Sequence, residues 1–213
     1  MINRLLRAKH WEIFLFTIVF PMLLAVIPIL LLLPSVQDGV APETSTVLGT
    51  FVIFVVLVAF GAVGFFGWIW SINMGLQHLI PDHLKKNMLQ FKIAFFIPYT
   101  YVLLLMLGMI IGPLLLLIDG TEVFILNEDM TLFLLKIAFT FISTFHIISI
   151  ICIIFCFYFA AKTIKLAELQ RDVTFGDFVG EFFMIWFFYI GVWVLQPKLN
   201  KLLEEGPQHP LNE

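Results

Sequence analysis

Residues 47–70 read VLGTFVIFVVLVAFGAVGFFGWIW and contain no charged side chain. A transmembrane helix needs about 20 mostly apolar residues to cross the hydrocarbon core of a bilayer. Three further runs meet that length, at residues 11–33, 93–118 and 132–159. A membrane β-barrel would instead show short segments in which apolar and polar residues alternate. These runs predict an all-α, polytopic helical membrane bundle with four transmembrane helices.

The composition supports the same class. Hydrophobic residues make up 61% of the chain and charged residues 13%, against about half and a quarter in soluble globular proteins. No connector between the runs is long enough to hold a soluble domain. We therefore expect residues 1–213 to form a single integral membrane domain, with the lipid bilayer as its surroundings and no nucleic acid as a partner.

Basic residues gather in alternate connectors. They precede the first run, separate the second from the third, and follow the fourth; the members are Arg4, Arg7, Lys9, Lys85, Lys86, Lys92, Lys162, Lys165 and Arg171. The other connectors, residues 35–47 and 118–129, carry only acidic charges. Because short basic loops stay on the cytoplasmic side, we expect a cytoplasmic N-terminus. The first run exceeds a signal-peptide core, so we expect it to stay uncleaved.

The C-terminal segment, residues 174–203, leaves two alternatives. Its apolar stretch, residues 182–195, is short for a span, which favours a re-entrant or interfacial element. Gly191 offers a place to break the helix. If the chain returns, Lys198 and Lys201 join the other basic residues. If it forms a fifth span instead, Glu181 enters the membrane and both lysines face the opposite side.

Proline and glycine positions predict where helices bend, begin and end. Pro21 and Pro28 are expected to bend the first helix, because each lacks a backbone donor. Pro81 predicts a short interfacial helix that starts near it. Residues 131–165 contain no proline and no glycine, so the fourth helix is expected to continue beyond the membrane, through Leu169.

Small residues recur on the second and third helices. They are Gly61, Gly64, Gly67, Ser71 and Gly75 on the second, and Gly108 and Gly112 on the third. Gly67, Ser71 and Gly75 are four residues apart, as are Gly108 and Gly112; this spacing places small residues on one face, where a second helix can approach closely in lipid, and predicts helix packing. A glycine-lined pore or a hinge is the alternative.

His146 lies near the middle of the fourth run, flanked by Ser143 and Ser149. Ionisable residues at that depth are costly and often functional, as proton relays or ligand contacts. The alternative is a neutral imidazole that hydrogen-bonds to a neighbouring helix. Cys152 and Cys156 share a face nearby, but two thiols do not complete a metal site. We expect them to pack as apolar side chains and expect no metal.

Asp177 and Glu181 are four residues apart and share a helix face. Paired carboxylates can bind cations or move protons. The alternative is structural: an acidic residue near Thr174 suits a helix start, and nearby basic residues suit ion pairing, namely Lys162, Lys165 and Arg171.

Residues 161–202, AKTIKLAELQRDVTFGDFVGEFFMIWFFYIGVWVLQPKLNKL, carry a resemblance. They are similar to the C-terminal part of small hydrophobic membrane proteins of Bacteroidota to which no activity is assigned. The matching positions are Glu168, Leu169, Gln170, Asp177, Phe178, Glu181, Phe182, Trp186, Gly191, Trp193, Gln196, Pro197 and Asn200. Tyr189 departs from the pattern, where proline is expected. The resemblance implies a bacterial inner-membrane protein and implies no activity.

Motifs of catalysis and nucleotide binding, such as G-x-x-x-x-G-K-[ST], H-E-x-x-H, C-x-x-C-H and G-x-S-x-G, are absent from the sequence. We therefore expect a non-enzymatic accessory or assembly protein without a cofactor, which contacts another membrane protein or a second copy of itself through its helices. The first alternative is a small transporter or channel that uses the polar face around His146. The second is a membrane-embedded redox protein.

Overall fold

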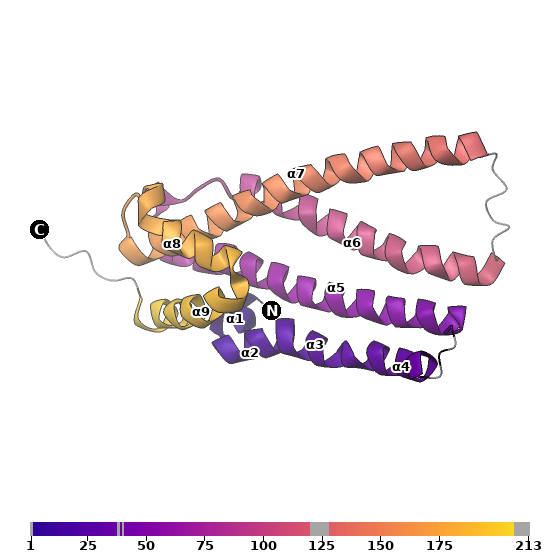
Figure 1. The fold of residues 1–213 in the computed structure, drawn as a ribbon. Coiled ribbons are helices and arrows are strands. Elements are labelled where there is room, and N and C mark those ends of the chain that lie inside the picture. Colours follow the sequence, from indigo (N-terminus) through magenta and orange to yellow (C-terminus); the bar gives the residue numbers. More distant parts are fainter. Residues whose placement is uncertain (1, 38, 40, 120–127, 207–213) are drawn as a thin grey trace, which may run out of the picture.

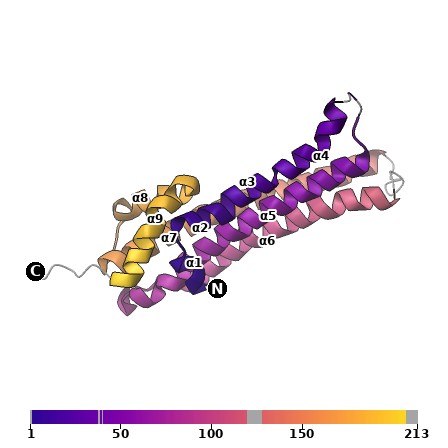
Figure 2. The same ribbon diagram turned by 90° about the horizontal axis from the view of Figure 1, so that it is seen from below.

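The computed structural model describes residues 2–37, 39, 41–119 and 128–206, and these contain helices and turns but no strand. Four helical stretches are long and apolar enough to cross a membrane: His10–Pro34, Thr44–Leu79, Met88–Gly112 and Leu132–Leu169. They lie side by side in one elongated bundle (Figures 1 and 2). The predicted all-α bundle is confirmed, and the chain is a multi-pass membrane protein.

The first stretch is interrupted several times. Its pieces are α1 (Ile2–Arg7), α2 (His10–Phe14), the π-helical turn η1 (Leu15–Val19), α3 (Phe20–Leu24) and α4 (Val26–Gln37). Pro21 cannot donate to the carbonyl of Thr17, and the π turn lies at that point. Pro28 cannot donate to the carbonyl of Leu24, the last residue of α3. The two prolines thus account for the interruptions they were expected to cause.

The next helices are long. They are α5 (Thr44–Gly75), followed by the 3-10 turns η2 (Leu76–Leu79) and η3 (Asp82–Leu84), then α6 (Met88–Asp119) and α7 (Glu128–Leu169). The predicted extension of the fourth helix to Leu169 is confirmed. The short helix expected near Pro81 is found as the 3-10 turn η3, which begins directly after Pro81 and ends where the backbone becomes extended at Lys85. Residues 120–127 of the second acidic connector lie outside the described part.

The C-terminal segment folds as two helices, α8 (Phe175–Trp186) and α9 (Phe188–Glu205), which we call the C-terminal hairpin. The chain reverses at Phe187, where φ is −90° and ψ is 56°. A Cβ atom at Gly191 would overlap the carbonyl group of Met184, so the tight reversal requires glycine there. With 12 residues, α8 extends about 18 Å, too short for a hydrocarbon core of about 30 Å. The segment therefore folds back on itself, as the re-entrant or interfacial alternative expects, and it is not among the four stretches long and apolar enough to cross a membrane.

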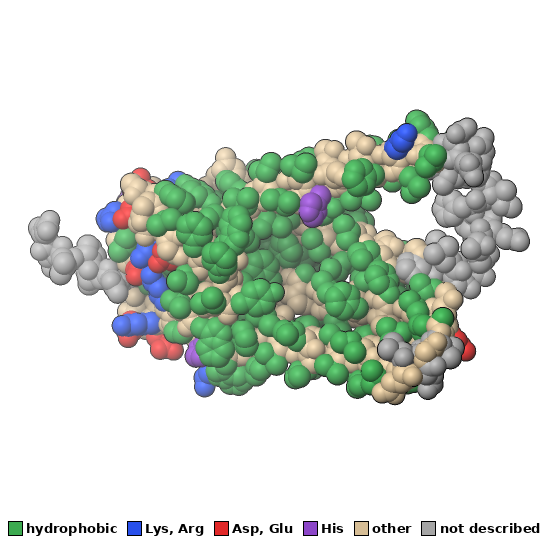
Figure 3. All heavy atoms as spheres, viewed as in Figure 1, with side chains coloured by type: hydrophobic (Ala, Val, Ile, Leu, Met, Phe, Trp, Pro, Cys, Tyr) green, Lys and Arg blue, Asp and Glu red, His purple; other side chains and the backbone are tan. Residues whose placement is uncertain are grey.

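The two ends of the bundle differ. The charged end holds α1, the turns η2 and η3, the last turns of α7 and the C-terminal hairpin; Figure 3 shows most Lys, Arg, Asp and Glu side chains there. The largest fully buried side chains cluster at this end, among them Trp68, Phe91, Phe178, Leu195 and Leu199. At the opposite end, the far end, α6 and α7 diverge (Figure 1). The protein core therefore fixes the charged end and leaves the far end open.

Candidate functional site

Four charged side chains form a closed ring where α7, α8 and α9 meet. Lys165 Nζ lies 2.9 Å from Glu168 Oε2 and 3.1 Å from Glu181 Oε1. Lys198 Nζ lies 2.8 Å from each of the same two oxygens. The side chains are only 11–28% exposed. Each ammonium group thus contacts both carboxylates, and the ring has no net charge.

This ring gives Glu181 a structural role. Glu168 lies one helical turn after Lys165 on α7, whereas Glu181 and Lys198 come from the two arms of the C-terminal hairpin. Charges withdrawn from water are costly unless they are paired, and here every member is paired twice. A neutral, closed ring holds the hairpin against α7 and leaves Glu181 no free charge for a transported cation.

Asp177 lies apart from the ring, at the start of α8. Its carboxylate accepts hydrogen bonds from the Thr174 backbone N–H (2.7 Å) and the Thr174 hydroxyl (2.9 Å), and Arg171 contacts it at 3.0 Å. The Thr174 bonds and the Arg171 charge lower the pKa of Asp177 below its ordinary value. This is the arrangement that the helix-start interpretation predicts, and Asp177 does not share a site with Glu181.

Gln196 forms a second buried junction, which we call the Gln196 junction. Its side chain on α9 is fully buried and accepts a hydrogen bond from Trp68 Nε1 at 2.8 Å. Its Nε2 donates to the carbonyls of Leu6 and Ala8, each at 2.9 Å. Asn200 Nδ2, one turn later, donates to Ala8 as well. One amide therefore ties α9 to α5 and to the chain's N-terminal segment.

His146 lies on an exposed face of α7. Its Nδ1 is 3.3 Å from the hydroxyl of Tyr101 on α6. Ser143 is half-buried, whereas Ser149 is buried and its hydroxyl has no hydrogen-bond partner among the described residues. Lys165, in the ion-pair ring, is about 28 Å further along α7 at 1.5 Å per residue. The transporter residues proposed from sequence, His146 and Glu181, are therefore not brought together.

The glycines of α5 face the first helix. A Cβ atom at Gly61 would lie 3.0 Å from the carbonyl oxygen of Thr17, and one at Gly64 would overlap the Thr17 methyl group. At Gly67 it would lie 3.3 Å from Leu5. These contacts are the close approach that the small-residue pattern predicts.

The other small residues behave differently. Ser71 is buried and donates to the carbonyl of Gly67 on its own helix, and Gly75 ends α5. A Cβ atom at Gly108 or Gly112 would meet no described atom within 4 Å. The helix contact expected at these two glycines of α6 is therefore not made by the described residues of this chain.

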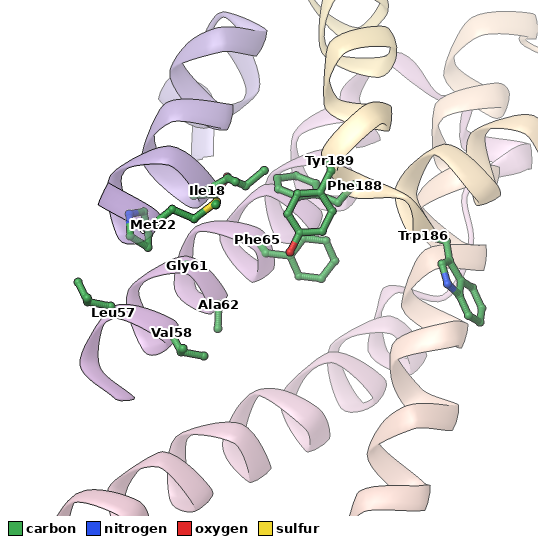
Figure 4. A pocket seen from close by; sticks show the side chains of 12 residues that line it. Ile18, Met22, Leu57, Val58, Gly61, Ala62, Phe65, Trp186, Phe188 and Tyr189 are labelled. Atoms are coloured by element: carbon green, nitrogen blue, oxygen red, sulfur yellow. The ribbon is translucent and has the colours of Figure 1, made fainter. Parts of the chain in front are cut away.

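A cavity of about 450 Å³ lies beside the tip of the C-terminal hairpin. Figure 4 shows Phe65 of α5 close to Phe188 and Tyr189, with Ile18 and Met22 on the first helix and Trp186 on the other side of the turn. The Phe65 and Phe188 rings meet edge to face, 5.0 Å apart. The lining is almost entirely apolar, so this cavity offers packing volume and no evident chemistry.

Comparison with models of protein families, with curated proteins and with solved structures gives no match. The chemistry must therefore be judged from the geometry. Among the described residues, no group of three or more His, Cys, Asp and Glu side chains could hold a metal ion. The ion pairing expected from sequence is found for Lys165 with Glu181 and for Arg171 with Asp177. Sequence reasoning missed Glu168 and Lys198 as the other members of the ring, and it missed the Gln196 junction.

Proposed function

We propose that the chain is an integral protein of the bacterial inner membrane that acts as an accessory or assembly subunit through helix–helix contacts, without enzymatic activity. The charged end then faces the cytoplasm, because the basic residues of three connectors belong to it. The ion-pair ring and the Gln196 junction at this end are paired within the chain. A surface for a partner must therefore be sought on the helices that extend away from it.

One observation carries this proposal: Gly108 and Gly112 are small residues one turn apart on α6, and no described atom would meet a Cβ at either position, unlike at Gly61 and Gly64 of α5. Both sets of glycines are spaced for close helix approach. On α5 the first helix fills the space, whereas none of the residues that the structure describes fills the space beside Gly108 and Gly112 on α6. The apolar neighbours Leu104 and Leu107 are 64% and 52% exposed. This face of α6 suits a transmembrane helix of another molecule.

The adjoining half of α7 strengthens the proposal. Most large apolar side chains of residues 132–151 are exposed, with Phe139 reaching 73%. Toward the far end α6 and α7 diverge (Figure 1), beyond the contact that Tyr101 makes with His146. A partner helix between them would bury apolar surface and bring packing contacts that lipid chains provide less regularly.

The test compares purified full-length chains in mild detergent by native mass spectrometry. Gly108→Ile combined with Gly112→Ile fills the open face, and Gly49→Ile is the matched control, since Gly49 also has open space around it. We expect a complex with a second protein or a second copy that the double variant loses and the control keeps. A parent chain that is always monomeric would contradict the proposal.

The transporter and redox alternatives both centre on His146 and gain less support. The contact of His146 with Tyr101 is a hydrogen bond between two helices, which is the structural interpretation of that histidine. Flux through proteoliposomes that falls in His146→Ala would favour transport, and a Soret band in the purified protein would favour haem.

A further inference from the structure

A groove of about 750 Å³ runs along the outer face of α6, on the half nearer the charged end. Its volume lies within the range of about 300–1,000 Å³ that is usual for ligand sites. Apolar and aromatic side chains form its walls: Leu89, Ile93, Phe96 and Leu104 from α6, with Phe141 and Phe145 from α7. A groove with walls from two helices restrains a flexible chain more than a flat helix face does.

The groove has the length of one membrane leaflet. Lys92 lines it near the start of α6 and Leu104 lines it at the other extreme. At 1.5 Å per residue the distance between them along the helix is about 18 Å. Half of a hydrocarbon core of about 30 Å is about 15 Å. A molecule anchored at Lys92 therefore has room for an acyl chain that reaches the middle of the bilayer.

The charge of the groove is confined to one extreme. Lys92 is its only ionisable lining residue apart from the phenol of Tyr101, and it forms no ion pair with any residue that the structure describes. By contrast, Lys85, Lys165, Lys198 and Lys201 all have carboxylate partners.

The surrounding end of the bundle is also electropositive. Contact with the neighbouring Lys162 side chain lowers the pKa of Lys86; Lys86 lies just before α6, and Lys162 lies on the part of α7 at the same end. Two ammonium groups held together favour an anion nearby. Positive charge at headgroup level with an apolar groove beneath it matches an amphiphile with an anionic head.

We propose that this groove holds one anionic phospholipid from the leaflet at the charged end. The Lys92 ammonium group pairs with the phosphate, and one acyl chain follows the groove past Phe96 toward Leu104. The partner contact at Gly108 and Gly112 begins one helical turn beyond Leu104, so the two sites adjoin at that side chain and are otherwise distinct. A transmembrane helix would fill the apolar part of the groove but would leave Lys92 without an anion.

The test uses native mass spectrometry of the full-length chain with phosphatidylglycerol or phosphatidylcholine carrying identical acyl chains. We expect one retained phosphatidylglycerol and weaker retention of phosphatidylcholine. Lys92→Gln should weaken phosphatidylglycerol binding about fivefold, the factor that corresponds to roughly 1 kcal/mol per lysine at an anionic surface. Lys201→Gln removes the same charge at the same end, outside the groove, and should leave binding unchanged.

A second variant tests the apolar part. Ile93 is 55% exposed, so Ile93→Trp should fold normally while filling the groove, and retention of the lipid should be lost. Equal retention of both lipids by the parent, unaffected by Lys92→Gln, would overturn the proposal. The proposal would also be overturned if the parent retained no lipid and formed a dimer that Ile93→Trp abolishes. That result would assign the groove to a second copy of the chain.

Discussion

Gln196 connects parts of the chain that are 190 positions apart, since its side chain donates to the carbonyl of Leu6. A buried amide stabilises a fold only when its donors and acceptors are paired, and the cost of leaving them unpaired exceeds the net gain from pairing them. Gln196 satisfies this condition with Trp68 on one side and two backbone carbonyls on the other. The junction therefore fixes where the first helix begins.

Replacing Gln196 with Leu should destabilise the protein by about 2–3 kcal/mol, because the Trp68 indole N–H and the Leu6 and Ala8 carbonyls lose a buried partner. Thermal unfolding in detergent, followed by circular dichroism, measures the effect. Gln90 is exposed on α6, so Gln90→Leu serves as the control and should change little. Equal stability of both variants would show that the junction is dispensable.

Asp177 gives the charged end an acid-sensitive contact. Because its pKa is lowered in the folded chain, the carboxylate stabilises the folded state above its ordinary pKa of 3.8. That stabilisation is lost as the pH falls through the lower folded-state value. Unfolding midpoints measured between neutral pH and about pH 3 should fall more steeply in the parent than in Asp177→Asn. Parallel curves would contradict this assignment.

At the scale of elements, the C-terminal hairpin depends on two features: the reversal at Phe187 and the ion-pair ring. The sequence contains the ingredients of both, since Gly191, Glu181 and Lys198 can all be identified in it. It does not show their pairing, because Glu181 meets Lys198 only after the chain has reversed. A linear pattern of apolar residues cannot decide between crossing and returning.

Glu181→Gln should destabilise the hairpin by about 3 kcal/mol, since it leaves two lysines with one carboxylate in a largely buried ring. Limited proteolysis of the hairpin measures this directly and should become faster. Glu205→Gln is the control, because its pair with Lys201 is 3.7 Å long and 66% exposed on each side. If both variants are cleaved at the parent's rate, the ring does not hold the hairpin.

Gly191→Ala should prevent the native reversal, because the added methyl group overlaps the Met184 carbonyl. Folded protein elutes as a single peak in size-exclusion chromatography, and we expect the amount of protein in that peak to be low for Gly191→Ala. Gly180 lies on α8 with open space around it, so Gly180→Ala should fold like the parent. A normal yield for Gly191→Ala would mean that the reversal has another geometry.

For the whole molecule, the long apolar runs were sufficient to predict the class and the four spans, and the lack of proline and glycine in residues 131–165 predicted the extension of α7. They could not predict the divergence of α6 and α7, because large apolar side chains flank the few polar residues of 132–151 on most sides and do not mark which side meets α6. The same uniformity hides which face meets a partner. The spacing of Gly108 and Gly112 marks one face of α6 as a candidate for helix contact. Only the structure shows that no described atom contacts this face, whereas the first helix contacts the glycine face of α5.

The open far end is the central claim, and photo-crosslinking in intact membranes tests it most directly. A benzophenone side chain at Leu107 lies beside the open glycine face, whereas one at Met22, which is 68% exposed on α3, is the control. We predict a discrete protein adduct from position 107 and only lipid adducts from position 22. Lipid adducts alone at both positions would contradict a helix partner on α6.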